Sequence, residues 1–239
     1  MSALLTNSST LDSEFGPLDY AERFRFIRGH WDGEAVATTS AGAQSAVMLD
    51  LIHRYAPEIP VVFIDTGYLF PETYDFFEEL QERFPLDYRI YAPQVTAARL
   101  ERIKGKLWEK GDEGLVEYGK LTKVEPMNRA LREIGSAVWI SGLRRAHSEE
   151  RGQRRFIEQQ GETTKVFPIL DWSDDDIASY MAIHELPLHP LVRKGYVSIG
   201  DWHSTQKLEE GMSVEETRFN GAKRECGLHE MSGDADWQI

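Results

Sequence analysis

Hydrophobic and polar positions follow two different periods along the first part of the chain. Residues 18–31 (LDYAERFRFIRGHW) repeat apolar side chains at helical spacing, which predicts an amphipathic helix. Residues 34–39 (EAVATT) are partly β-branched and predict a short strand, which ends in the small-residue loop 40–45 (SAGAQS). Residues 46–52 (AVMLDLI) again carry an apolar face at helical spacing. A strand, a glycine-containing turn and a helix form the first half of a βαβ unit.

The alternation of strands and helices continues to about residue 140. Residues 61–64 (VVFI) form a continuous apolar run, which is typical of a parallel strand buried on both faces. Strands alternating with helices predict an α/β fold with a doubly wound, mostly parallel sheet, whose ligands bind at the carboxyl ends of the strands. We predict further strands at 87–91 and 137–140, and helices at 71–80, 94–110 and 124–134.

Beyond residue 165 the periodicity becomes less regular. Ser173 and Asp176 have the spacing of a capping box and predict a helix through Met181. Residues 191–239 have few long apolar periods and many glycines, which indicates a mobile extension.

These patterns divide the chain into three parts. We predict a flexible N-terminal lead-in at 1–16, a single α/β nucleotide-binding domain at 17–205, and a mobile C-terminal tail at 206–239. The N-terminal segment has no cationic region followed by an apolar stretch, as a signal peptide would have. No window approaches the ~20 apolar residues that span a bilayer, so we expect a cytoplasmic protein.

The charge balance narrows the choice of ligands. The chain has 239 residues with 27 Lys and Arg against 40 Asp and Glu, a formal charge of -13. This excess of acid argues against general binding to nucleic acids or anionic membranes. A small anionic substrate would therefore need a locally basic site.

The single cysteine, Cys226, excludes an intrachain disulfide. It also excludes a zinc or iron–sulfur site held mainly by thiolates of this chain. Cys226 lies in the sequence KRECGLHE, close to Lys223, Arg224 and His229. Neighbouring cations lower the pKa of a thiol and so favour the reactive thiolate. The alternative is an exposed thiol without a chemical role.

The loop after the first strand is a candidate phosphate-binding loop. Small residues allow a close approach of the backbone to a phosphate, and the N–H groups that begin the next helix are donors. The alternative is an ordinary connection, and the loop is not a Walker loop because no Gly-Lys-Ser/Thr follows. Its residues are Ser40, Ala41, Gly42, Ala43, Gln44 and Ser45.

Two further groups of polar residues follow predicted strands. Asp65 and Thr66 come directly after residue 64, and either contact an adenosine or form a turn that caps the next helix. Arginine presents a planar fork suited to phosphate and sulfate oxygens. A solvated helix face, paired with nearby glutamates, explains Arg154 and Arg155 equally well. The basic candidates near the end of the fourth strand are Lys123, Gly142, Arg144, Arg145 and Arg151.

Taken together, these segments resemble the phosphoadenylyl-sulfate (PAPS) reductases, the thioredoxin-dependent enzymes of assimilatory sulfate reduction. The resemblance runs from about residue 20 to about residue 230. It rests on TTSAGAQSAVML, VVFIDTGYLFPETYDF, KVEPMNRAL, WISGLRRAHSEERG, FPILDW, HPLVRKGYVSIGD and KRECGLHE. The terminal ECGLH is the most specific of them, because members of the family carry their catalytic cysteine there.

The departures from related families are informative. Relatives that reduce adenylyl sulfate (APS) usually hold a four-iron cluster on two cysteine pairs. Those positions are occupied here by Tyr118, Gly119, Asp201 and Ser204, so the resemblance implies an enzyme without a cluster, metal or other cofactor. It then implies PAPS as substrate, although APS reductases without a cluster exist and remain an alternative.

The resemblance also implies a mechanism and partners. The nucleotide is expected to bind across the strand ends, and the Cys226 thiolate to attack its sulfonate. An external dithiol protein, thioredoxin or glutaredoxin, would then release sulfite. The family further implies a homodimer. Arg218, Lys223 and Arg224 are candidates for contact with the 3′-phosphate, and His229 belongs to the same tail.

Two other classes of function stay open at this point. ATP pyrophosphatases typically have SGGxDS at the loop 40–45, whereas this chain has Ala41 and Gln44 in place of the first glycine and the aspartate. A ligase or transferase of that class would release pyrophosphate and would not depend on Cys226. A non-catalytic nucleotide-binding protein would bind without turnover.

Overall fold

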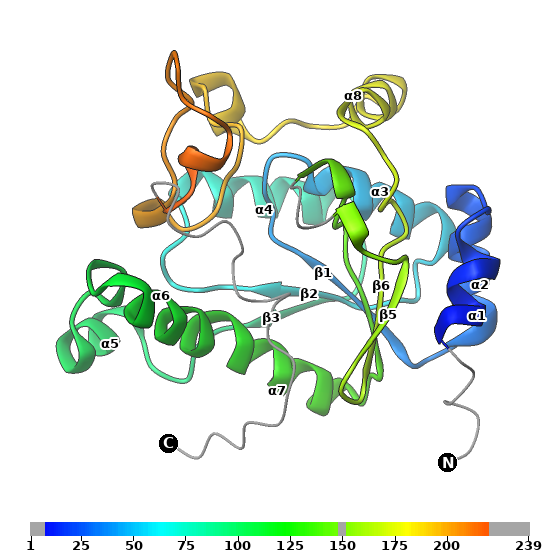
Figure 1. The fold of residues 1–239 in the computed structure, drawn as a ribbon, viewed down its shortest axis with the longest axis horizontal. Helices are drawn as coiled ribbons and strands as arrows, with labels where there is room; N and C mark the ends of the chain where they lie inside the picture. The colour runs from blue at the N-terminus through cyan, green and yellow to red at the C-terminus, as the bar shows by residue number, and fades with distance from the viewer. Residues whose placement is uncertain (1–7, 148–151, 220–239) are drawn as a thin grey trace.

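The computed structural model describes residues 8–147 and 152–219 (Figure 1). Its centre is a six-stranded sheet in the order β3-β2-β1-β4-β6-β5. All neighbouring strands are parallel except β5 and β6, which form an antiparallel pair. The strands are β1 (Ala35–Thr39), β2 (Val61–Ile64), β3 (Tyr88–Tyr91), β4 (Val138–Ile140), β5 (Ile157–Gln160) and β6 (Thr163–Val166). The predicted doubly wound, mostly parallel sheet is confirmed.

The order of the strands reverses direction at β1. The chain adds β2 and β3 on one side of β1, then crosses over and places β4 on the other side, where Ala37 is the partner of Ile140. The carboxyl ends of β1 and β4 therefore diverge into loops that leave a crevice between them. In open α/β sheets this is where ligands bind.

Helices cover both faces of the sheet (Figure 1). One face packs against α2 (Tyr20–His30), α3 (Ser45–Tyr55), α4 (Pro71–Arg83) and α8 (Asp174–Ile183), and the buried apolar residues there form one large core. The opposite face packs against α7 (Glu125–Ile134), with α5 (Ala97–Lys104) and α6 (Gly111–Gly119) beside it.

The burial of β1 explains its composition. Ala35 and Ala37 belong to the core under α3, whereas Val36 belongs to the core under α7, where it joins Met127 and Trp139. Successive side chains of a strand point to opposite faces, so a strand covered on both faces is mostly apolar, and Thr38 accepts a hydrogen bond from the indole N–H of Trp139. The small alanines let α3 lie close to the sheet, and α3 begins at the loop 40–45.

Helix termini follow the signals in the sequence. Asp19 and Ser173 each form a capping box with the residue three positions later, Glu22 and Asp176. The predicted start of α8 is thus confirmed. The shorter segments are η1 (Leu107–Glu109), η3 (Arg145–His147), η5 (Pro190–Lys194), η6 (Trp202–Ser204) and η7 (Glu215–Thr217), together with a π-helix, η2 (Lys120–Val124), that joins α6 to α7.

Several elements differ from the prediction. The lead-in predicted at 1–16 contains the helix α1 (Ser8–Phe15), because Phe15 inserts into the large core and is fully buried. A single helix predicted at 94–110 is broken at Gly105, whose φ of +66° is left-handed, so that α5 ends there and η1 follows. The strands β5 and β6 and the helix α6 were not predicted at all.

The domain also extends beyond the predicted boundary at residue 205. Thr217 is fully buried, and Thr205 and Arg218 form an antiparallel bridge. Residues 206–219 therefore fold back on the domain instead of belonging to a tail. No helix in the described part of the chain is long and apolar enough to cross a membrane.

Candidate active site

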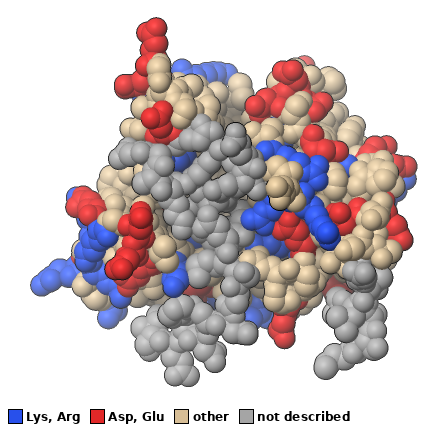
Figure 2. Space-filling model, viewed as in Figure 1, with Lys and Arg blue, Asp and Glu red and all other residues tan. Residues whose placement is uncertain are grey.

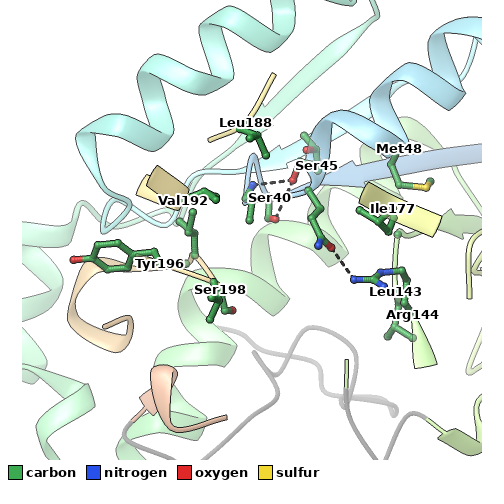
Figure 3. Close-up of a pocket in the computed structure, with 18 of the residues that line it drawn as sticks. Ser40, Ser45, Met48, Leu143, Arg144, Ile177, Leu188, Val192, Tyr196 and Ser198 are labelled. Atoms are coloured by element: carbon green, nitrogen blue, oxygen red, sulfur yellow. Dashed lines mark hydrogen bonds between the residues drawn. The ribbon is translucent and has the colours of Figure 1, made fainter. Parts of the chain in front are cut away.

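A cavity of about 1350 Å³ opens at the carboxyl ends of β1 and β4. Figure 3 shows Ser40 and Ser45 at its centre, between a group on one side that includes Leu143, Arg144 and Ile177 and a group on the other side that includes Val192, Tyr196 and Ser198. The cavity therefore lies at the predicted crevice, with the loop 40–45 in its middle.

The loop 40–45 is held in a tight turn. The N–H of Gly42 donates to Ser45 Oγ at 2.7 Å, and Ser40 Oγ lies 3.5 Å from the same hydroxyl. Ala41 has a φ of +45°, a left-handed conformation that costs energy for a residue with a side chain. A Cβ on Gly42 would lie 3.1 Å from Ser40 Oγ, so glycine keeps this turn open. Five of the six predicted residues line the cavity, and the side chain of Ala41 is buried beneath them.

Arg144 is buried in the wall of the cavity, with 1% of its side chain exposed. Its guanidinium donates to Gln44 Oε1 at 2.8 Å, to Asp174 Oδ1 at 2.8 Å and to the carbonyl of Trp172 at 3.2 Å. The Gln44 bond is drawn in Figure 3. The guanidinium thus joins the loop after β1, the loop after β4 and the start of α8.

Lys123 reaches the cavity from the π-helix. Its Nζ lies 2.7 Å from Asp201 Oδ2, and both side chains are buried. Thr66 Oγ1 donates to Asp201 Oδ1 at 2.5 Å. Burial alone would raise the pKa of Asp201, but the Lys123 ammonium and the Thr66 hydroxyl outweigh burial and lower it to about 2. The Asp201 carboxyl is therefore ionised at neutral pH.

Arg218 supplies a third cation to the lining of the cavity. Its Nη1 donates to Ser198 Oγ at 3.3 Å and its Nε to the carbonyl of Ser204 at 3.3 Å. An added Cβ on Gly200 would lie 2.4 Å from the guanidinium, so glycine is needed there for the arginine to pass. Arg218 comes from the segment 206–219, which explains why the fold-back of that segment matters for the site.

The remainder of the cavity is apolar. Ile177 and Met181 of α8 line it, together with Leu186, Leu188 and Val192 from the segment that follows. A cavity with an apolar part and three cations, two of them paired with Asp174 and Asp201, is suited to a ligand that combines a flat apolar ring with several negative charges.

Comparison with known proteins agrees with this geometry. The family model for the phosphoadenosine phosphosulfate reductase domain matches residues 34–207. The phosphoadenosine 5′-phosphosulfate reductase of Xanthomonas oryzae pv. oryzae is 47% identical over 96% of this chain and 95% of its own length. That of Xylella fastidiosa is 53% identical over 81% of each chain.

The chain belongs to the phosphoadenosine phosphosulfate reductase domain family. The structure of a phosphoadenylyl-sulfate (PAPS) reductase from Candida auris, a phosphate complex, is 29% identical and covers 86% of this chain and 99% of that one, with a TM-score of 0.73. The FMN adenylyltransferase of Candida glabrata, at 16% identity and a TM-score of 0.58, shares the fold alone. The resemblance stated from the sequence motifs is thereby confirmed.

Besides the buried Ala41, two candidate residues of this reductase-family chain do not line the cavity. Asp65 Oδ1 accepts the N–H of Gly67 at 2.8 Å and the hydroxyl of Tyr74 at 2.7 Å, which is the turn-forming alternative. Arg145 donates twice to the carbonyl of Arg154, at 2.8 and 3.1 Å, and its guanidinium lies over the ring of Phe156. The structure brings together the loop 40–45, Thr66, Lys123, Gly142, Arg144 and Arg218.

The remaining candidates lie outside the described residues, so their roles stay predictions. They are Arg151, Lys223, Arg224, Cys226 and His229. Figure 2 shows Lys and Arg side chains gathered near the centre of one face, over η3 and the start of β5, while acidic side chains surround them. A local basic region on this acidic member of the reductase family is what an anionic ligand requires.

Two acidic residues of the site were not predicted. Asp174 pairs with Arg144, and Asp201 pairs with Lys123. Asp174 lies in an acidic run that is explained by the helix N-terminus alone, so its second role is invisible in the sequence. Asp201 follows the glycine of the SIGD segment, and that motif was the available signal.

The positions that correspond to cluster ligands in related reductases carry no thiol. Tyr118 and Ser204 are buried, and Trp108 stacks on His203 with ring centroids 3.9 Å apart in the same region. These side chains do not suit an iron–sulfur cluster, because its iron atoms bind thiolates. Within the described part of the chain, no group of three or more His, Cys, Asp and Glu side chains is arranged to hold a metal ion.

Proposed function

We propose that the protein reduces 3′-phosphoadenylyl sulfate to sulfite and adenosine 3′,5′-bisphosphate, with Cys226 as nucleophile and a reduced dithiol protein as electron donor. The observation that carries this proposal is the cavity at the β1 and β4 strand ends, where the loop 40–45 meets Lys123, Arg144 and Arg218 in a chain of this family. Three cations offset the charge of a nucleotide that bears two phosphates and a sulfonate.

The first step transfers the sulfonate to the enzyme. The Cys226 thiolate attacks the sulfur of the phosphosulfate, a sulfur–sulfur bond forms, and the bond from that sulfur to the bridging oxygen breaks. Adenosine 3′,5′-bisphosphate leaves with the electron pair of that bond, and the enzyme keeps a cysteine S-sulfonate. Lys123 and Arg144 stabilise the negative charge that gathers on the leaving phosphate.

The second step is the reduction. A thiolate of thioredoxin or glutaredoxin attacks the sulfur of Cys226, and sulfite leaves with the electron pair of the sulfur–sulfur bond. The second thiol of the donor then displaces the Cys226 thiolate, so the donor becomes a disulfide. An external donor is required because this chain has one cysteine and cannot resolve the S-sulfonate by itself.

The apolar part of the cavity would receive the adenine ring, with Ile177 and Met181 against its face. Phosphosulfate would then lie over Ser40 and Ser45, close to Lys123. We further propose that the protein is cytoplasmic, since a reduced thiol and reduced thioredoxin are maintained in that compartment. The resemblance to the family also leads us to propose a homodimer.

Steady-state kinetics test the substrate. Sulfite production is measured with PAPS and with APS, using reduced thioredoxin and then glutaredoxin as donor. We expect kcat/KM for PAPS to exceed that for APS by at least about 100-fold, because a buried cation left without its phosphate partner costs several kcal/mol. Equal values would assign the protein to the APS reductases without a cluster. Pyrophosphate release from ATP, with no sulfite from either nucleotide, would overturn the proposal.

A further inference from the structure

The ion pair between Lys123 and Asp201 is the most deeply buried pair of opposite charges at the wall of the cavity in the described part of the chain. The side chain of Asp201 is 1% exposed and that of Lys123 is 8% exposed, with 2.7 Å between Nζ and Oδ2. Both residues line the cavity. Oδ2 makes no hydrogen bond of good geometry to the described residues, so the contact is a close ion pair.

The position of the Asp201 carboxylate is fixed independently of Lys123. Thr66 Oγ1 donates to Oδ1, and that hydroxyl in turn accepts the N–H of Tyr68 at 3.2 Å. The N–H of Trp202 donates to the carbonyl of Tyr68 at 2.9 Å, and Leu69 forms an antiparallel bridge with Asp201. Main-chain contacts therefore hold the carboxylate at the end of β2, whereas Lys123 reaches it with a flexible four-carbon side chain.

The other groups around Lys123 do not replace this carboxylate. The ring of Tyr118 lies 5.7 Å from Nζ, and burial keeps the pKa of its phenol well above the ordinary value, so it is neutral. Burial lowers the pKa of His203 to about 4, so this ring is also neutral at pH 7. Arg218, which also acts on His203 among the groups that the structure describes, is a cation. Asp201 thus carries the negative charge that faces the ammonium.

We infer that Asp201 is a positioning residue, whose carboxylate holds the Lys123 ammonium at the wall of the cavity, oriented toward the anionic part of the nucleotide. An unpaired lysine side chain samples many rotamers, and ordering it costs conformational entropy. If the side chain is held in one rotamer before the nucleotide binds, the transition state does not carry this cost. This inference rests on the proposed function for the identity of the nucleotide, and it assigns to Asp201 no contact with the reacting atoms.

A double-mutant cycle tests whether Asp201 acts through Lys123. The rate of Cys226 S-sulfonation in a single turnover with PAPS is measured for wild type, Lys123→Met, Asp201→Asn and the double variant. We expect Asp201→Asn to lower this rate about tenfold in the presence of Lys123, and less than about twofold in the Lys123→Met background. The dissociation constant of adenosine 3′,5′-bisphosphate is measured for the same four proteins. Asp201→Asn should weaken binding in the presence of Lys123 and should have little effect in the Lys123→Met background.

Asp50→Asn is the matched control. Asp50 is also a buried carboxylate, with 4% of its side chain exposed, and it pairs with Arg54 and accepts a hydroxyl hydrogen bond, from Tyr180 at 2.7 Å. It does not line the cavity. Because the carboxylates of Asp50 and Asp201 are both buried, both variants should lower thermal stability. The rate of S-sulfonation should fall with Asp201→Asn and stay within about twofold of wild type with Asp50→Asn.

Additive losses in the cycle would overturn the inference, as would equal losses of rate in Asp201→Asn and Asp50→Asn, since both results describe a general structural role. If wild type forms no S-sulfonate from PAPS, the proposed function fails, and the cycle of nucleotide dissociation constants decides the inference by itself. Coupling of the two residues in that cycle supports the positioning role, and additivity refutes it.

Discussion

Arg144 donates a hydrogen bond to the side-chain oxygen of Gln44 across 100 residues of sequence, at 2.8 Å. Gln44 is the position where ATP pyrophosphatases typically have an aspartate. A neutral amide there accepts from the arginine and adds no second carboxylate to that of Asp174, which already pairs with Arg144. The bond therefore joins two features that the sequence presents separately, the small-residue loop and the arginine after β4.

Replacing Gln44 by Glu tests this account of the neutral amide. Glutamate keeps the length and one oxygen of the side chain, so the contact with Arg144 can persist. We expect KM for PAPS to rise about tenfold or more, because the added carboxylate offsets the arginine and repels the nucleotide. Steady-state kinetics at low salt measure the effect, with Gln44→Met as the control that removes the contact without adding charge. An unchanged KM in Gln44→Glu would contradict the account.

The two neighbouring arginines should differ strongly in function. Arg144 lines the cavity, whereas the guanidinium of Arg145 is bound to the carbonyl of Arg154. We expect Arg144→Met to lower kcat/KM by at least about 100-fold, as for loss of a buried charge contact with substrate. Arg145→Met should lower it by less than about fivefold and act mainly on stability, as measured by thermal unfolding. The opposite order would mean that Arg145 turns into the cavity when the nucleotide binds.

Arg23 stabilises the segment that supports Arg144. It is 3% exposed, binds both oxygens of Asp171 at 2.7 and 2.8 Å, and donates to the carbonyl of Pro168 at 2.8 Å. The nearby carbonyl of Trp172 accepts from Arg144. Arg23→Met should lower the free energy of unfolding by about 3 kcal/mol, since buried acceptors lose their donor. Urea denaturation measures this loss, and a value below about 1 kcal/mol would refute the assignment.

The burial of His189 leads us to expect that the folded protein loses stability in acid. It is fully buried, its Nδ1 accepts the N–H of Leu191, and its Nε2 lies 3.1 Å from Thr73 Oγ1. Burial lowers its pKa from 6.5 to about 4. Between these values the unfolded chain binds more protons than the folded one, so the free energy of unfolding falls as the pH falls.

Replacement of His189 by Asn isolates this effect. Asparagine keeps an acceptor for Leu191 and does not titrate. Between pH 7 and pH 5 wild type should lose roughly 1–2 kcal/mol more than His189→Asn, as urea denaturation at the two pH values would show. Equal losses in the two proteins would place the acid sensitivity elsewhere in the chain.

The parallel core of the fold is predictable because its strands are buried on both faces. Val61 to Ile64 and Val138 to Ile140 are uninterrupted apolar runs, whereas β1 was predicted from its partly β-branched residues and the small-residue loop that follows it. The strand β5 (Ile157–Gln160) escapes prediction because Ile157 is its one apolar residue and the strand pairs with β6 alone. Its register depends on β6, which no local pattern reveals.

The site is predictable to the extent that topology brings strand ends together. The loop 40–45 and Arg144 were predicted for this reason. The role of Asp201 was not predicted, because its burial arises from contacts with Thr66 and Lys123 that are distant in the sequence, although the SIGD motif marks its position. Conversely, Asp65 and Arg145 have the residue types and positions of binding residues, but neither lines the cavity. Asp65 accepts the hydroxyl of Tyr74, and Arg145 donates to the carbonyl of Arg154.

Intact-mass measurement of the reduced protein after mixing with PAPS tests the central claim most directly. We expect wild type to gain one SO₃ group, Cys226→Ser to gain none, and reduced thioredoxin to remove the group as sulfite. An adduct that persists in Cys226→Ser, or sulfite production without any adduct on wild type, would contradict it.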